Sequence, residues 1–138
     1  MAGAKSTPDY EAMIAHAEAA VAALRDSFRE TLAEDIASLE EIYSRLDKGV
    51  PPADVLRDIH SIAHNIKGQG GSFGYHLITS IGASLCDYLR TGDRTSKRSL
   101  DIVNAHIKLL RLVSDNDLFG TGGDTGARIV EKLATLTA

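Results

Sequence analysis

The sequence predicts an all-α protein: an antiparallel up-and-down four-helix bundle with additional N-terminal and C-terminal helical segments. Apolar residues recur three or four positions apart through most of the chain, which is the period of an amphipathic helix. No segment shows the strict alternation of apolar and polar residues that is typical of a half-buried strand. Glycine and proline gather in a few short segments, and helices joined by short loops pack as antiparallel neighbours.

The first helical pattern covers residues 9–48, which contain no glycine or proline. Its apolar positions are Met13, Ile14, Ala17, Val21, Leu24, Phe28, Leu32, Ile36, Leu39, Ile42, Tyr43 and Leu46. Because globular helices usually run about 8–20 residues, we expect a break near Asp26, with Ser27 capping a second segment. Residues 1–8 are expected to form a flexible tail, and residues 9–138 a single domain.

Glycine and proline mark the limits of the later helices. Gly49 follows the first pattern and Pro51-Pro52 opens the next, as expected of a helix end followed by a helix start. Further helices are expected at about 53–71, 75–91, 96–117 and 126–136. A turn at 72–74 separates the second helix from the third, and the glycine-rich segment 119–123 reads as a plain linker.

Composition excludes several classes of function. The net charge of −4 offers no basic face for nucleic acid. Only 5% of the residues are aromatic and none is Trp, so a base-stacking platform is also excluded. The single cysteine, Cys86, cannot form an intrachain disulfide, which fits a reducing compartment. No secretory signal or membrane-spanning run is present, so we expect a cytoplasmic protein that does not bind membranes.

Three residues of the second helix form the chief candidate site. His64, Lys67 and Gly68 lie three and four positions apart, so they share one helix face. That face lies away from the apolar stripe made by Ile59, Ile62, Ala63 and Ile66. A glycine inside a helix costs about 0.5–1 kcal/mol relative to alanine. We therefore expect Gly68 to leave room for a partner to approach His64, the alternative being a glycine that packs against another helix.

This arrangement suits phosphoryl transfer. A neutral imidazole has a free lone pair that can attack phosphorus. A lysine one turn away would offset the charge of the phosphoryl oxygens. Positioning and charge neutralisation are most of what this chemistry asks of a protein. His60 and Gly71 extend the same outer stripe by one turn in each direction, and we expect a partner to dock over them.

The segment His64-Asn65-Ile66-Lys67-Gly68, with Gly74 six residues after Gly68, resembles the histidine-containing phosphotransfer (HPt) domain family of two-component phosphorelays. The resemblance implies an antiparallel four-helix bundle with the active histidine exposed. It implies that His64 accepts a phosphoryl group from a receiver-domain phospho-aspartate and passes it to another receiver. Lys67 would assist the phosphate, Gly68 would keep the approach open, and Gly74 would shape the turn.

The resemblance also sets expectations about partners and cofactors. The partners would be receiver domains, those of a hybrid histidine kinase among them, and the protein would be a monomer. It would hold no cofactor and no metal of its own, because Mg²⁺ belongs to the receiver, and it would lack autokinase and ATPase activity. Arg90 matches a position where some members carry a basic residue near the site. Cys86 stands where many members have Gln or another polar residue, and we expect it to be a core residue.

Alternatives remain open at this point. The chain could be a non-catalytic partner-binding module. His60 and His64, at i and i+4, could share a metal ion, although no motif supplies further ligands. The phosphoacceptor module of a sensor kinase fits less well, because Asn65 replaces the expected acid and no proline follows. His16 and His106 lie near apolar stripes and are expected to be partly buried or on the surface.

Overall fold

The computed structural model describes residues 9–138, which form α-helices joined by short turns and contain no β-strand. The prediction of an all-α fold is therefore confirmed. The expected flexible tail, residues 1–8, lies outside the described residues. The elements are α2 (Tyr10–Ser44), the 3₁₀ turn η1 (Arg45–Lys48), α3 (Pro52–Gly70), the 3₁₀ turn η2 (Gly71–Phe73), α4 (His76–Arg90), α5 (Lys97–Asp115) and α6 (Gly123–Thr137).

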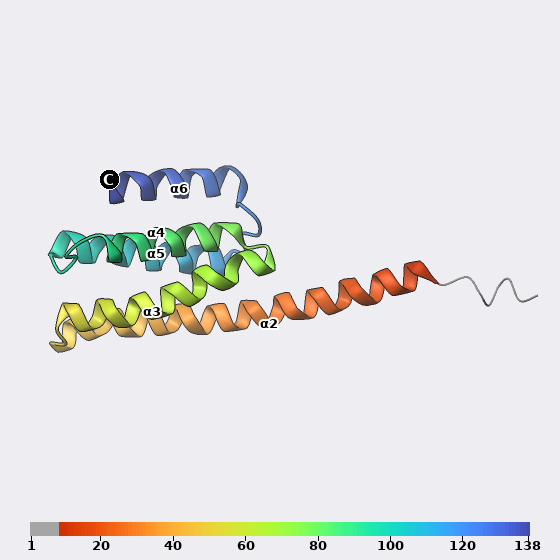
Figure 1. Ribbon diagram of the computed structural model, residues 1–138, viewed down its shortest axis with the longest axis horizontal. Coiled ribbons are helices and arrows are strands. Elements are labelled where there is room, and N and C mark those ends of the chain that lie inside the picture. The colour runs from red at the N-terminus through yellow and green to blue at the C-terminus, as the bar shows by residue number, and fades with distance from the viewer. Residues whose placement is uncertain (1–8) are drawn as a thin grey trace, which may run out of the picture.

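Four of these helices enclose the core, and successive helices run in alternating directions (Figure 1). α2 contacts α3 and α5, α4 contacts α3 and α5, and α6 lies against α4 and α5 as an added fifth helix. The helix pair in closest contact is α3 with α4. The core consists of large aliphatic side chains from all four bundle helices, among them Ile36, Leu39, Ile59, Ile66, Ile78, Ile81, Leu85, Ile107 and Leu110.

The prediction of a break in the first helix is wrong. α2 runs without interruption from Tyr10 to Ser44, and Ser27 is an exposed residue within it. The helix continues because no glycine or proline interrupts it, and the part after the expected break is held on the bundle by the buried series Phe28, Leu32 and Ile36. The polar pair Asp26-Ser27 is tolerated since it faces solvent.

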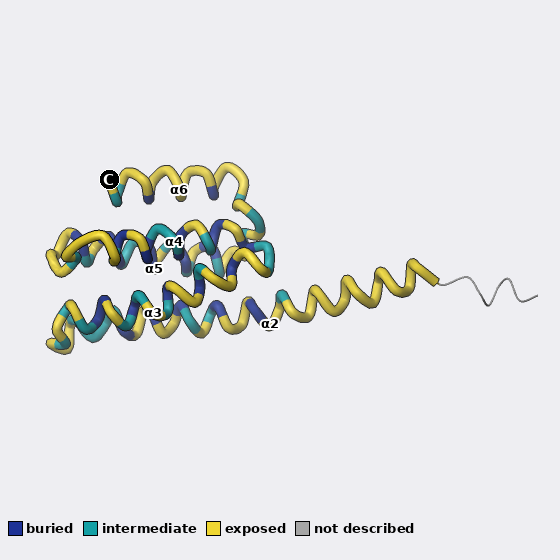
Figure 2. Tube along the Cα trace, in the orientation of Figure 1, coloured by how far each residue is buried: buried dark blue, intermediate teal, exposed yellow. Residues whose placement is uncertain are grey.

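The first half of α2 also differs from expectation. Met13, Ile14, Val21 and Leu24 follow the apolar period, yet each is 56–60% exposed. Figure 2 shows that this part of α2 projects past the end of the bundle, where no other helix covers it. The periodicity identified an apolar face correctly, but tertiary packing leaves that face uncovered over its first four turns.

Local sequence explains where the helices begin and end. Gly49 ends η1 in the left-handed conformation with φ of 82°, which glycine adopts without strain. Pro52 then occupies the first turn of α3, where a missing N–H is not needed. Ser96 caps α5, because its side-chain oxygen accepts a hydrogen bond from the Ser99 N–H at 3.2 Å. These signals place the helix limits within a few residues of the positions expected from sequence.

One polar side chain is fully buried in the bundle. His106 on α5 has no exposed surface, whereas the sequence predicted a partly buried or surface residue. Its Nδ1–H donates to the Ile102 carbonyl at 2.8 Å, and that assigns Nε2 as the acceptor of the Ser84 hydroxyl at 2.9 Å. Burial lowers the pKa of His106, while the hydrogen bond to Ile102 opposes the shift. Burial therefore favours the neutral ring, in which both nitrogens are hydrogen-bonded.

The lowered pKa of His106 predicts that stability falls on mild acidification. The unfolded state binds a proton below the ordinary histidine pKa of about 6.5, whereas the folded state resists doing so. The neutral His106 ring therefore contributes fully to the free energy of unfolding above about pH 6.5. Below that pH its contribution declines, by at most about 1.4 kcal/mol per pH unit. Urea unfolding of the wild type and of His106→Asn between pH 7.5 and 5.5 checks this. Equal pH slopes for the two proteins would contradict it.

Candidate functional site

His64 lies on the outer face of α3, exposed to solvent, as the helical period predicts. The ring of His60, one turn earlier, is nearly parallel to it, with the two ring centroids 6.4 Å apart. Within residues 9–138, neither nitrogen of the His64 ring has a hydrogen-bond partner. The ring is therefore exposed and not engaged by this part of the chain, so an incoming group can approach it.

Lys67 is anchored through its backbone at the closest approach of α3 and α4. Its carbonyl accepts a hydrogen bond from the Thr79 hydroxyl at 3.4 Å. A Cβ placed on Gly82 would lie 3.2 Å from the Cα, Cβ and N atoms of Lys67. The ammonium group forms no ion pair with any carboxylate of residues 9–138. The backbone is fixed, and the charge stays available for an anion beside His64.

Gly68 is open to solvent, and a packing role for it is excluded. No heavy atom in the described part of the chain lies within 4 Å of a Cβ built on Gly68, apart from its own helix backbone and chain neighbours. Nothing in the fold therefore requires a glycine there. The result is a bare strip of helix next to the His64 and Lys67 side chains.

The glycines that bring α3 and α4 together are different ones. A Cβ on Gly70 would lie 2.6 Å from the Thr79 hydroxyl oxygen and 3.1 Å from the Thr79 backbone nitrogen. Gly82, which sequence reasoning did not single out, makes the corresponding approach to Lys67. The sequence does contain a signal for this close approach, because Thr79 and Gly82 are small residues three apart on one face of α4.

Gly74 and Gly71 lie in the turn beyond the site. Gly74 has φ of 83°, and a Cβ there would lie 2.6 Å from the ring of Phe119. The Gly120 N–H donates to the Gly74 carbonyl at 2.8 Å, and the Leu77 N–H donates to the Gly120 carbonyl at 2.9 Å. The turn is thereby tied to the segment between α5 and α6. Gly71 is exposed, and a Cβ there would make only an ordinary contact with Thr79.

Arg90 lies at the opposite end of the His64 stripe. Its Nη2 atom is 2.6 Å from an oxygen of Asp87 on the same helix. Its side chain lines a groove between the first turns of α3 and the last turn of α4, together with Ala53, Leu56, Arg57, His60, Ser61 and Leu89. The structure therefore groups Arg90 with His60, one turn before His64, and pairs its charge with Asp87.

Cys86 is a core residue, as expected, with 2% of its surface exposed. Burial raises the pKa of its thiol, while the nearby Lys67 charge acts in the opposite direction. No group of three or more His, Cys, Asp or Glu side chains in residues 9–138 is placed to hold a metal ion. The pairing of His60 with His64 thus has no third protein ligand within that range.

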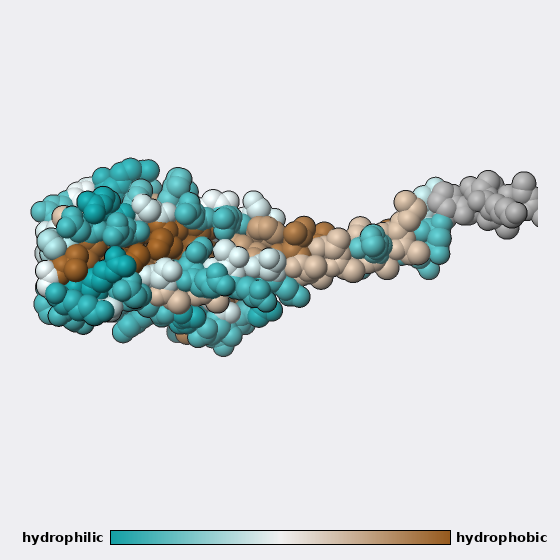
Figure 3. Space-filling model, turned by 90° about the horizontal axis from the view of Figure 1, so that it is seen from below, coloured by the Kyte–Doolittle hydropathy of each residue, from teal (hydrophilic) through white to brown (hydrophobic). Residues whose placement is uncertain are grey.

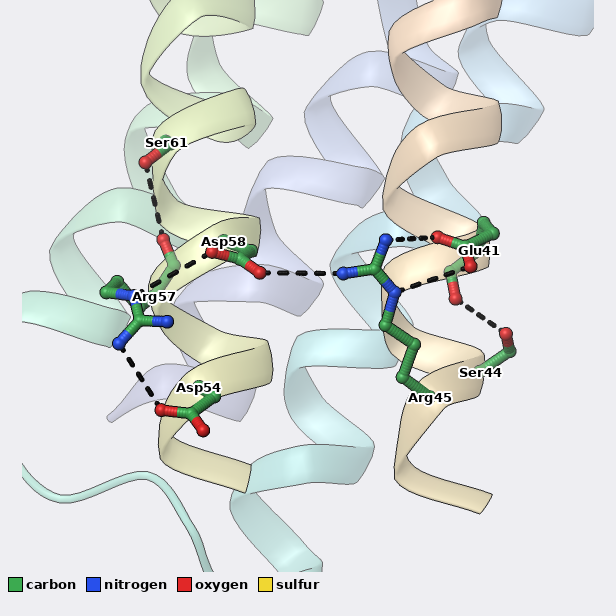
Figure 4. Close-up of polar contacts among 7 residues, drawn as sticks. All are labelled: Glu41, Ser44, Arg45, Asp54, Arg57, Asp58 and Ser61. Carbon is green, nitrogen blue, oxygen red and sulfur yellow. Dashed lines mark hydrogen bonds and ion pairs between the residues drawn. The ribbon is translucent and has the colours of Figure 1, made fainter. Parts of the chain in front are cut away.

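A surface network of charged residues joins the beginning of α3 to the end of α2 (Figure 4). Arg45 lies 2.9 Å from Glu41 and 3.5 Å from Asp58, and so links the two helices. Arg57 interacts with Asp58 and Asp54 on its own helix. Exposed ion pairs of this kind contribute little free energy, about 0–1 kcal/mol each. They connect the helix that carries His64 to α2 through Arg45 and Asp58.

The comparison with family models decides the identity of this fold. The model described as Hpt domain matches residues 23–113, which is more than half of the chain. The chain belongs to the Hpt domain family. Membership implies histidine phosphotransfer in a phosphorelay and interaction with receiver domains. The comparisons with curated proteins and with solved structures found no match.

The Hpt match covers α3, α4, most of α5 and the part of α2 that packs in the bundle. It leaves out α6 and the projecting beginning of α2. No helix in residues 9–138 is long and apolar enough to cross a lipid bilayer.

Proposed function

We propose that His64 accepts a phosphoryl group from the phospho-aspartate of one receiver domain and passes it to the aspartate of another. The observation that carries this proposal is the exposed His64 ring beside the bare surface at Gly68. A receiver active site must come close enough for its phosphorus to reach an imidazole nitrogen. An uncovered helix strip allows that approach.

The other four histidines are poorer candidates for the phosphoryl acceptor. His16 lies outside the region matched by the Hpt domain, and His106 is buried with both nitrogens hydrogen-bonded. His76 is exposed at the first position of α4, at the end of the bundle. His60 is half-buried beside the Arg90 groove. Of the five, only His64 combines exposure with an open helix surface and a lysine one turn away.

The transfer itself needs little from this chain. A neutral His64 ring, with Nε2 as the attacking atom, forms a bond to phosphorus while the bond from phosphorus to the aspartyl oxygen breaks. The aspartate leaves as a carboxylate with the electron pair, and the reverse sequence loads the next receiver. The Lys67 ammonium offsets the charge of the phosphoryl oxygens. In this proposal the chain holds no cofactor of its own, because Mg²⁺ comes with the receiver. It also has no autokinase or ATPase activity, because the phosphoryl group comes from the receiver.

The receiver is proposed to dock along the stripe of His60, His64, Lys67, Gly68 and Gly71, with Arg90 at its edge. This exchange would take place in the cytoplasm, and the single buried cysteine is compatible with a reducing compartment. The identity of the receivers, those of a hybrid histidine kinase included, would follow from a transfer profile against the receiver domains of one cell.

The chemistry of the adduct tests the proposal. A phosphorylated receiver mixed with this protein is expected to transfer label to it as an acid-labile, alkali-stable phosphoramidate. Fragmentation of the labelled protein by mass spectrometry is expected to place the added mass on His64. An acid-stable adduct, or an adduct on His60 or His76, would contradict the proposal. The absence of any adduct would favour the non-catalytic partner-binding module.

The substitution Gly68→Gln is expected to slow transfer about tenfold or more, because a long side chain would occupy the approach to His64. The free energy of unfolding should stay the same or increase, since the helix propensity of glycine is less favourable than that of other residues by about 0.5–1 kcal/mol. Stopped-flow transfer kinetics and urea unfolding measure the two quantities. Ala134→Gln, on the exposed face of α6, is the matched control and should leave transfer unchanged. Unchanged transfer in Gly68→Gln would remove the proposed reason for this glycine.

A further inference from the structure

The beginning of α2 presents an apolar face that nothing in residues 9–138 covers. Five large apolar side chains of this segment are 56–62% exposed: Tyr10, Met13, Ile14, Val21 and Leu24. Figure 1 shows the segment extending alone past the end of the bundle. Most of it lies before residue 23, where the Hpt match begins. The bundle fold of the family therefore does not account for it.

The spacing of these residues is that of a coiled coil. Ile14, Val21 and Phe28 lie seven apart, and a second series seven apart consists of Tyr10, Ala17 and Leu24. The two series alternate at steps of four and three, as the a and d positions of a heptad repeat do. Phe28 is buried against Phe73 and Tyr75, with its ring centroid 4.8 Å from that of Phe73. The stripe that packs inside the bundle thus continues outward, and Figure 3 shows apolar surface passing from the bundle onto the projecting helix.

We propose that this stripe pairs with the same stripe of a second copy of the chain, as an antiparallel two-helix coiled coil about a two-fold axis, in place of the monomer that the family resemblance implies. An antiparallel pair sets an a residue of one helix against a d residue of the other. Ile14 would then pack against the partner's Leu24, and Val21 against the partner's Ala17. Both contacts fall in one register, and they lie before Phe28, which its own bundle already covers.

Charge supports the antiparallel direction. Glu11, Glu18 and Arg25 flank the stripe on one side. In the antiparallel register Glu11 lies opposite the partner's Arg25, and the contact occurs twice by symmetry. A parallel pair would instead place Glu18 and Arg25 opposite uncharged residues, the partner's Met13 and Ala20.

Arg25 has no carboxylate partner among residues 9–138. Its guanidinium lies 4.3 Å from the centre of the Phe119 ring but forms no ion pair with a carboxylate of residues 9–138. Its Nε atom is buried without a hydrogen-bond acceptor. The terminal nitrogens of the guanidinium are not among the buried atoms, so the partner's Glu11 would supply a carboxylate to them and not to Nε.

The middle of the segment can accommodate a close approach of two helices. Ala17 and Ala20 lie next to the proposed axis, and their small side chains would let the backbones come near each other. The opposite face carries Ala12, Ala15, Ala19, Ala22 and Ala23. These alanines favour the helix but present no large apolar side chain to a partner. The one unfavourable contact is Glu18, which would face the partner's Glu18 across the axis.

Sedimentation equilibrium of the full chain tests the association. At about 0.1 mM, where a micromolar Kd leaves most chains paired, we expect twice the chain mass of 14.8 kDa. Val21→Glu should raise the Kd about 30-fold or more, because it buries a charge in the centre of the interface. Ala19→Glu adds the same charge on the outer face and should leave the Kd unchanged. A wild type that stays monomeric, or a dimer that Val21→Glu leaves intact, would overturn the proposal.

Charge exchange and crosslinking test the direction. Glu11→Arg and Arg25→Glu should each weaken the dimer, and the double variant should restore it, which loss of folding would not do. Glu18→Gln should lower the Kd. Ala20→Cys should form an intermolecular disulfide across the axis, while Ile14→Cys should not, since each copy's residue 14 lies opposite the partner's Leu24. The reverse crosslinking pattern would establish a parallel pair and overturn the antiparallel assignment. Cys86 does not interfere, because it is buried.

Discussion

Replacing His64 by Gln is expected to reduce phosphotransfer to the assay background, a loss of about 1,000-fold or more. Glutamine approximates the size and polarity of the imidazole, but its nitrogen lone pair is delocalised into the carbonyl and is not nucleophilic enough to attack phosphorus. The side chain is exposed on α3 and has no hydrogen-bond partner in residues 9–138, so the substitution leaves no buried group unsatisfied. The free energy of unfolding should change by no more than about 0.5 kcal/mol. Label transfer from a phosphorylated receiver, run beside urea unfolding, measures both effects.

Two matched variants control for the removal of an imidazole as such. His60→Gln removes the ring stacked one turn before His64, and His76→Gln removes an exposed ring at the start of α4. Each should retain transfer, with His60→Gln reduced to the extent that the receiver touches it. Transfer that survives His64→Gln, or that is lost equally in His76→Gln, would contradict the assignment of the acceptor.

The substitution Gly82→Leu is expected to destabilise the fold by about 1–3 kcal/mol and to slow transfer as well. A Cβ at residue 82 alone would lie 3.2 Å from three atoms of Lys67, and the rest of a leucine would have to push α4 away from α3. The gain in helix propensity, about 1 kcal/mol, offsets only part of that cost. Because Lys67 lies at the contact, the displacement should also move its ammonium relative to His64. Urea unfolding and transfer kinetics would show the two losses together.

Gly68→Ala is the control for the effect of Gly82→Leu. It also removes a helical glycine from the α3–α4 pair, but at a position where no heavy atom lies within 4 Å of the new Cβ apart from neighbouring backbone. It should therefore stabilise the protein by about 0.5–1 kcal/mol. Gly82→Ala should fall between the two, close to neutral, because its tight contact and its gain in propensity oppose each other. Equal effects of Gly68→Ala and Gly82→Leu would show that the contact with Lys67 is not what limits residue 82.

Local sequence determined much of this protein. The apolar period, with glycine and proline at the stops, established the all-α class and most helix limits, because capping and propensity act within a few residues. The site could be found in the same way. His64, Lys67 and Gly68 share a face in any regular helix, whatever that helix packs against. The burial of Cys86 could likewise be expected from its place in the apolar pattern of α4.

Only the tertiary structure decided which apolar helix faces are covered and which helices cover them. Periodicity identifies an apolar face but not the helix that packs on it, so Phe28 became core while Val21, on the same stripe, stayed exposed. For the same reason His106 is buried, and Gly82 rather than Gly68 sets the distance between α3 and α4. Such properties depend on contacts between residues far apart in the chain. The sequence by itself identified the reactive patch on α3, and the packing of α4 against Lys67 decided how firmly that patch is held.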